Sequence, residues 1–283
     1  MLNLSLARPT WQSHLRAVLA IARKNWLHFL RYPLNAVFQI VQPVMWLTPV
    51  YFLGRTFATA QGNVGFAAYT GISDYMAFII VGSIISSYIS AVFWGMGLAL
   101  KTEMDSGVLE SNWMTPVPRP LLLVGQTLAN LGITTLNCVL VCVLAWLLFG
   151  FSISGNLLAA ALTLIPMLVA LYGFGFAFAA LVLLIRESNT LIDVSDFVIS
   201  TFSGSRFPVM VLPRFLLPIS LAIPLTYGLD AVRGLLLNGT TLLPIGTEII
   251  ILCAFMLVMV PTGYGVFKLV ERRCRIHGTL GMH

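Results

Sequence analysis

The sequence predicts an all-α, polytopic membrane protein with six transmembrane helices. Hydrophobic residue types make up 58% of the 283 residues, charged types make up only 9%, and the mean hydropathy is +0.92. A soluble domain carries roughly 25% charged residues, so this chain has too little charge to cover a globule in water. Uncharged apolar runs of about 20 residues, the length that a bilayer requires, recur along the chain. We therefore expect lipid to cover most of its surface.

The first expected element is an amphipathic helix over residues 11–31, which ends at Tyr32-Pro33. Apolar residues recur there at spacings of three and four, and the cations gather on another arc. Such a helix is expected to lie in the membrane interface, its apolar side toward lipid and its cations toward headgroups. A helix packed against the rest of the protein is the alternative. The apolar positions are Trp11, Leu15, Leu19, Ala22, Trp26 and Phe29, and the cations are Arg16, Arg23, Lys24 and Arg31.

Six spans are expected after this helix. The uncharged run over residues 121–185 is too long for one helix and is expected to break at residues 150–156. The fifth candidate is short and carries Asp193 and Asp196 near its start. The expected spans are residues 34–53, 75–100, 121–149, 157–185, 191–207 and 244–268.

The distribution of lysine and arginine predicts the orientation. Six spans leave both termini on one side, and a cytoplasmic N-terminus places 12 of the 16 lysines and arginines inside. We therefore expect a multi-pass protein of the plasma or inner membrane with both termini in the cytoplasm. The net charge of +6 does not indicate nucleic acid, because the basic residues form no patch with interleaved aromatics. The anionic lipids of the inner leaflet are the better partner.

The segment 208–243, between the fifth and sixth spans, is rich in proline. Its apolar pieces 215–223 and 229–237 are too short to span, and proline stops a helix. Two short re-entrant helices on the outer side are predicted, since irregular backbone at membrane depth needs protein or water to cover it. An ordinary outer loop is the alternative. Asp230 and Arg233 are three residues apart and could pair on a short helix.

Several kinds of chemistry are not expected. All four histidines lie outside the predicted spans, which argues against a Ser-His dyad, a haem or a histidine metal site in the membrane. No phosphate-binding G-x-x-x-x-G-K-[ST] loop occurs, so the chain is not expected to hydrolyse ATP, and no cofactor or metal is predicted. Cys138 and Cys142 are expected to be packing residues. The acidic residues near the spans, Asp74, Asp193, Asp196, Asp230 and Glu248, map near span ends or in the outer segment, and capping or salt-bridge roles are favoured over an ion relay.

The polar loop at residues 101–119 joins the second and third spans. It holds three of the ten acidic residues, and residues 101–110 can form a short helix. Gly107 permits close approach by another backbone, and residues 115–118 (TPVP) force an extended turn. Such a helix between two spans suits docking against a soluble partner, with a solvated loop as the alternative.

Four pieces of the sequence resemble the ABC-2 type transporter permeases. The loop residues Glu103, Gly107, Val108, Leu109 and Glu110, followed by Thr115-Pro116-Val117 and Arg119, resemble the E-x-x-x-G-[TV]-L-E…TPV-x-R signature. The other pieces occur in the family's order: Arg31-Tyr32-Pro33, Ser203–Pro208 with Leu212-Pro213, and Pro224–Tyr227 with Asp230 and Arg233. The nearest group is similar to the daunorubicin-resistance type of drug and natural-product exporters.

The resemblance implies one transmembrane domain over residues 1–283, paired with a second copy of itself. Each copy would dock on a separately encoded ABC ATPase, two copies in all, which would bind ATP and magnesium. Residues 11–31 would be the interface helix and 208–237 the re-entrant pair. The implied ATPase-coupling residues are Glu103, Asp105, Gly107, Leu109, Glu110 and Arg31. The implied outer-gate residues are Pro208, Pro213, Tyr227, Asp230 and Arg233.

The sequence thus predicts the permease subunit of an ATP-driven exporter for a drug-like, lipid or other amphipathic substrate. An apolar, aromatic path favours such substrates over hydrated ions. The candidate path residues are Tyr88, Phe93, Trp94, Phe197 and Phe202, with lipid-facing or packing roles as the alternative. Export of a lipid-linked polysaccharide is one rival function. An ATP-independent channel or secondary transporter is another and predicts a charged or broken mid-span site. A membrane enzyme is disfavoured by the missing histidines and nucleophile motifs.

Overall fold

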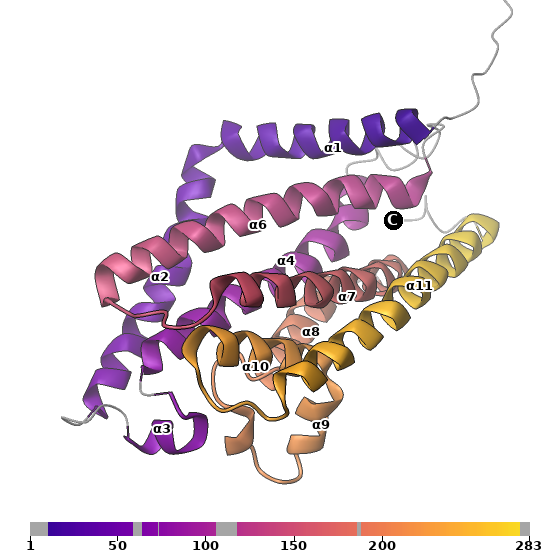
Figure 1. The fold of residues 1–283 in the computed structure, drawn as a ribbon. Helices are drawn as coiled ribbons and strands as arrows, with labels where there is room; N and C mark the ends of the chain where they lie inside the picture. The colour runs from indigo at the N-terminus through magenta and orange to yellow at the C-terminus, as the bar shows by residue number, and fades with distance from the viewer. Residues whose placement is uncertain (1–10, 59–63, 73, 106–117, 186–187, 278–283) are drawn as a thin grey trace, which may run out of the picture.

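The computed structural model describes residues 11–58, 64–72, 74–105, 118–185 and 188–277, and helices make up nearly all of these ranges (Figure 1). The all-α prediction is therefore confirmed for the described residues. In chain order, the elements are α1 (Trp11–Arg31), α2 (Pro33–Thr56), α3 (Val64–Thr70), α4 (Tyr75–Asp105), α6 (Arg119–Phe149), α7 (Leu157–Leu184), α8 (Ser188–Phe202), the 3-10 turn η1 (Val209–Val211), α9 (Leu217–Ala222), α10 (Pro224–Leu237) and α11 (Ile245–His277).

Five of these helices, α2, α4, α6, α7 and α11, are long and apolar enough to cross a membrane. The expected break at residues 150–156 is confirmed. Gly150 ends α6 in the left-handed conformation at φ +67°, which glycine adopts without strain. Asn156 begins α7 by accepting a hydrogen bond from the Ala159 N–H at 3.0 Å. The chain is a multi-pass membrane protein.

The fifth expected span differs from the observed helix. We expected a helix to continue to residue 207, but α8 has 15 residues and ends at Phe202. The chain turns there because Gly204, at φ +82°, adopts the left-handed conformation that ends helices. The helix is therefore too short to count among the five apolar spans, and the sixth crossing remains a prediction.

The helix α8 nevertheless lies antiparallel beside α4. Its Ile192 side chain lies 3.1 Å from the position that a Cβ on Gly97 would occupy. Near the other end of α4, the Ser205 carbonyl oxygen occupies the position of a Cβ on Gly82. Fifteen residues of helix separate the two glycines, which is about 22 Å at 1.5 Å per residue. Together with the following turn, α8 accompanies α4 over most of a hydrocarbon core about 30 Å thick.

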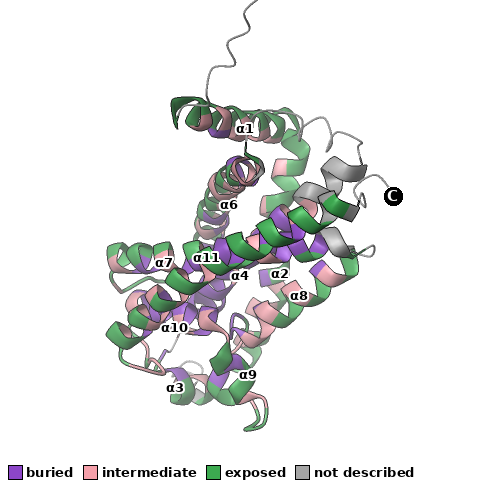
Figure 2. Ribbon diagram, turned by 90° about the vertical axis from the view of Figure 1, so that its right-hand side faces the viewer, coloured by how far each residue is buried: buried purple, intermediate pink, exposed green. Residues whose placement is uncertain are grey.

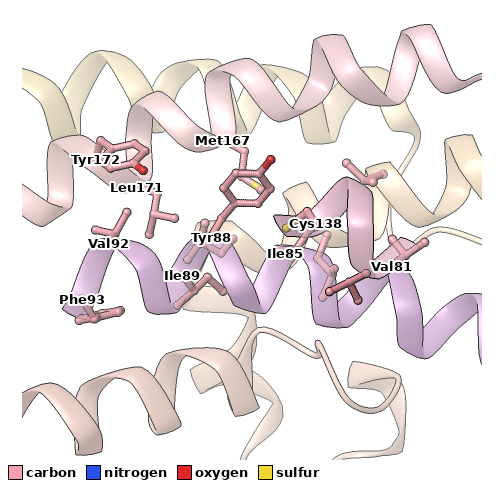
Figure 3. Close-up of a cluster of buried hydrophobic side chains, with 14 of the residues drawn as sticks. Val81, Ile85, Tyr88, Ile89, Val92, Phe93, Cys138, Met167, Leu171 and Tyr172 are labelled. Atoms are coloured by element: carbon pink, nitrogen blue, oxygen red, sulfur yellow. The ribbon is translucent and has the colours of Figure 1, made fainter. Parts of the chain in front are cut away.

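The helix α4 occupies the centre of the bundle, where α6, α7, α8 and α10 contact it. Its side chains Ile85, Ile89 and Val92 are buried, and Figure 3 shows them in one cluster with Met167 and Leu171 of α7. The same cluster contains Cys138 of α6, as expected for a packing residue. By contrast, α2 exposes nearly all of its length, which a lipid-facing helix can do (Figure 2).

The observed bounds of α1 confirm the predicted helix over residues 11–31, and it lies along the first half of α6 (Figures 1 and 2). A Cβ on Gly125 of α6 would lie 2.9 Å from the Ile21 Cβ, and one on Gly132 would lie 3.3 Å from the Trp26 ring. The opposite side of α1 exposes Arg16, Arg23 and Lys24, and Trp11 is exposed at the start of the helix. One face thus packs on the protein, and the rest stays available to a membrane surface.

The helices α7 and α11 cross with their backbones in contact. A Cβ on Gly263 would collide with the carbonyl oxygen of Gly173, whereas one on Gly265, also in α11, would meet nothing within 4 Å. Only a residue without a side chain allows this approach at position 263. The crossing fixes α11 against the core.

We expect Gly263→Ala to destabilise the protein and Gly265→Ala to leave it unchanged. An overpacked contact costs about 1–3 kcal/mol, and here the obstacle is backbone that cannot move aside. The measurement is the temperature at which the detergent-purified full chain loses its monodisperse elution peak. Equal transition temperatures for the two variants would contradict the close crossing.

Candidate functional site

A single buried arginine joins three segments at one end of the bundle. Arg233 of α10 is only 5% exposed. Its Nη1 donates to the Gly204 carbonyl at 2.7 Å, and its Nη2 donates to the carbonyls of Ser205 at 2.7 Å and Phe78 at 3.2 Å. Its Cζ lies 3.4 Å from the centroid of the Phe78 ring, within cation–π range. The guanidinium therefore connects α10 to the start of α4 and to the turn after α8.

The turn that supplies two of these carbonyls is tied to the end of α8 by its own serines. The hydroxyls of Ser203 and Ser205 donate to the Ser200 carbonyl at 3.0 and 2.6 Å. The guanidinium is suited to this place because its rigid fork can hold several acceptors at once. Burial lowers the pKa of Arg233 to about 9, and the negative charge of Asp230 opposes that shift. The side chain therefore remains charged at neutral pH.

Asp230 lies one turn before Arg233 and interacts with it through charge. The direct pair that the spacing suggested is replaced by other hydrogen bonds. The Asp230 Oδ2 accepts the Leu242 N–H at 2.5 Å, and its carboxyl also hydrogen-bonds the carboxyl of Glu248. Two carboxyl groups can share a hydrogen bond only when one carries a proton. Burial raises the pKa of Asp230, whereas the hydrogen bonds that it accepts from the Leu242 N–H and from Glu248 lower it.

Glu248 has the capping role that the sequence suggested. It lies in the first turn of α11, and its Oε1 accepts the Leu243 N–H, two residues before the helix, at 3.2 Å. The side chain is fully buried. Its contact with Asp230 therefore ties the start of α11 to α10.

A cavity of about 250 Å³ lies beside Arg233 and Asp230. At roughly 30 Å³ per molecule in liquid water, this space suits a small cluster of waters. Three of the five implied outer-gate residues, Pro208, Asp230 and Arg233, line it. The other two do not: Pro213 is exposed, and the Tyr227 hydroxyl donates to the Leu221 carbonyl at 2.9 Å. The walls of the cavity come from α3, α4, the segment after α8, α10 and residues 240–242.

The five aromatic residues of the expected path do not share one surface. Tyr88 and Phe93 are buried. The Tyr88 hydroxyl donates to Thr135 Oγ1 at 2.9 Å, and Phe93 packs edge-on against Phe178, with 4.7 Å between the ring centroids. Figure 3 shows them on different sides of α4. Trp94 of α4 and Phe197 of α8 are 36% and 60% exposed.

The last of the five, Phe202, is partly buried at the end of α8. Of the path candidates, therefore, Trp94 and Phe197 alone are exposed.

The implied coupling residues lie at the ends of two helices and beyond. Arg31 is exposed at the end of α1, and Glu103 and Asp105 are in the last turns of α4. Residues 101–105 continue α4 instead of starting a separate short helix, because nothing in that stretch breaks it. Gly107, Leu109 and Glu110 lie outside the described residues.

One polar contact inside the bundle was not anticipated. The sequence places Asp196 near the start of the fifth span, at a membrane boundary. In the structure both oxygens of its carboxylate accept from Ser90 Oγ, at 3.0 and 2.9 Å, beside the apolar part of α4. The sequence offered one signal for this contact: a carboxylate within a span needs a polar partner, and Ser90 is a polar residue within a neighbouring span.

The chain was compared with known protein families. The family model described as ABC-2 type transporter matches residues 16–237. The matched region begins within α1 and ends at the last residue of α10, so it includes Arg233 and its three carbonyl partners. No curated protein matches the chain.

We expect Arg233→Lys to lower the unfolding temperature and Arg233→Ala to lower it further. Lysine keeps the charge but lacks the planar fork that holds three carbonyls and stacks on Phe78. Alanine removes the arginine donor from the carbonyls of Gly204 and Ser205, at about 1–3 kcal/mol each. Arg214→Lys, at an exposed arginine of the same end, is the control. An Arg233→Ala variant as stable as the parent protein in detergent would refute the anchoring role.

We expect Asp230→Asn to flatten the dependence of stability on pH. A carboxyl whose pKa is raised by folding contributes stability that is greatest at low pH and is lost as the pH rises through the folded-state pKa. The parent protein should therefore become less stable as the pH rises above the usual carboxyl value of about 4. Asparagine accepts from Leu242 and donates to Glu248 at every pH. Unfolding temperatures across pH that fall in parallel for both proteins would contradict this assignment.

Proposed function

The chain belongs to the ABC-2 type transporter family, and from this membership we propose that it is the permease subunit of an ATP-binding cassette exporter. The family match, which extends from α1 through α10, is the observation that carries the proposal. The substrate is an amphipathic, drug-like or lipid molecule, and a separately encoded ATPase supplies the energy. The apolar helices provide the path.

We place α8 as the fifth of six membrane crossings. Its antiparallel course beside α4, from Gly97 to Gly82, supports this assignment. Both termini then lie on one side, and the excess of lysine and arginine assigns that side to the cytoplasm. The Arg233 anchor, which is Arg233 with its carbonyl partners at Gly204, Ser205 and Phe78, lies at the outer end. The 3-10 turn η1 lies there too, and the short helices α9 and α10 enter the membrane from that side without crossing it.

In the proposed mechanism, α4 transmits force between the two ends. Its 31 residues form one continuous helix about 46 Å long. The polar loop at residues 101–119, here called the coupling loop, lies at its cytoplasmic end, and Phe78 near its outer end is held by Arg233. Closure of the two ATPases pushes on the loop, and α4 tilts as a rigid body between two packings. That tilt alters the contacts of the outer gate.

Two copies of the chain enclose the transport path in this proposal. A carboxylate in the membrane needs protein or water around it, so the face of α4 and α8 that bears Asp196 points to the shared interior. Lipid contacts the outward helices, among them α2. The outer-gate residues Pro208, Pro213, Tyr227, Asp230 and Arg233 close the far end of the path.

The contact between Ser90 and Asp196 also bears on the rival function. A secondary transporter predicts a polar site within the spans, and this contact is one. The family membership favours transport that depends on ATP. Substrate uptake by inside-out vesicles that contain the chain and its ATPase separates the two functions, because uptake without ATP would exclude the exporter.

We expect the chain to co-purify with an ABC ATPase in mild detergent and Glu103→Lys to weaken that association. The substitution reverses a charge where α4 leads into the coupling loop. Arg214→Glu reverses a charge at the opposite end and should leave the association intact. The measurement is the ratio of ATPase to permease in the eluate. Recovery of the permease alone, or equal ratios for both variants, would count against the docking site.

A further inference from the structure

The face formed by α4 and α8 holds a carboxylate that is only partly buried. The single hydroxyl proton of Ser90 Oγ is shared between the two carboxylate oxygens of Asp196, and Trp94 also hydrogen-bonds this carboxylate. All three side chains lie along the antiparallel contact of the two helices. The carboxylate is therefore held in a fixed position, and one side of it remains open.

The depth of this carboxylate is unusual for a charged group. Ser90 lies eight residues before Leu98, where the apolar stretch of α4 ends, which is about 12 Å of helix. An acidic side chain facing lipid at the bilayer centre costs about 2.5–3.5 kcal/mol on insertion scales. Such groups instead face a protein interior or water. The α4–α8 face is therefore better suited to a transport path than to lipid.

The surroundings of Asp196 are aromatic and apolar. Trp94 of α4 is 36% exposed beside the carboxylate, and Phe197, the next residue of α8, is 60% exposed. Asp193 is also exposed, one turn nearer the proposed cytoplasmic end. Arg206 interacts with Asp196 through charge from the outer end of the site. An anchored carboxylate beside open aromatic rings suits a positive charge carried on an apolar body.

We propose that Asp196 makes the transport path selective for cationic amphipathic substrates. The carboxylate binds the positively charged centre of the substrate, while Trp94 and Phe197 contact its apolar body. Asp193 adds negative charge on the side from which the substrate enters. The inference rests on the proposed function and narrows its substrate class from amphipathic molecules to lipophilic cations.

Tetraphenylphosphonium and tetraphenylborate provide a direct test, because they share one shape and carry opposite charges. Their binding is measured by equilibrium dialysis against the full chain in lipid nanodiscs, with binding to empty nanodiscs subtracted. The wild-type chain should bind the phosphonium more tightly than the borate. Asp196→Asn should lower the phosphonium affinity by about tenfold, as the loss of one charge interaction implies, and should not lower the borate affinity.

Three control variants separate charge from structure. Asp196→Glu keeps the charge and should keep the preference, and Ser90→Ala should do so because it removes only the donor to the carboxylate. Asp74→Asn makes the same chemical change at the other end of α4 and should have no effect. A wild-type chain without a preference, or an Asp196→Asn variant that binds both ions equally less well, overturns the proposal. The assay needs neither ATP nor the ATPase, so its result is independent of whether the exporter assignment holds.

Discussion

The buried guanidinium of Arg233 is the contact on which the outer half of the structure depends. A charge out of water is tolerated only where hydrogen bonds replace its hydration. Three backbone carbonyls and the Phe78 ring supply that replacement, from segments about 30 and 155 residues away in the chain. These contacts of one side chain fix α10 against the start of α4 and the end of α8. The cavity of about 250 Å³ and the start of α11 take their positions from that anchor.

Polar groups are sparse in this chain, and they occur where helices must be positioned relative to one another. The contact between Ser90 and Asp196 sets the register of α8 on α4 within the apolar layer, and Arg233 fixes the same two helices nearer one end. Glycines allow the close approaches between these points, at Gly82 and Gly97 of α4. A continuous helix that is held at Phe78 can transmit displacement along its length, which is what the proposed mechanism requires of α4.

Local signals predicted the helices well because each has a local cause. The amphipathic period and Tyr32-Pro33 gave the bounds of α1, and Gly150 with Asn156 gave the break between α6 and α7. The end of α8 was placed too late, since the uncharged run continues past a turn that Gly204 and its serines form. The partners of Arg233 could not be predicted from the sequence, because they are backbone carbonyls, which every residue type carries. Likewise, a list of aromatic residues did not separate the buried Tyr88 and Phe93 from the exposed Trp94 and Phe197.

In the proposed topology, the coupling loop and the Arg233 contacts lie on opposite sides of the membrane, with the loop in the cytoplasm. Its most direct test is labelling with a membrane-impermeant maleimide, in a cysteine-free background, of Glu110→Cys in the loop and Arg214→Cys at the anchored end. We expect Arg214→Cys to react in intact cells and Glu110→Cys to react only after permeabilisation. Reaction of Glu110→Cys in intact cells would contradict this topology, because no cytoplasmic ATPase could then reach the loop.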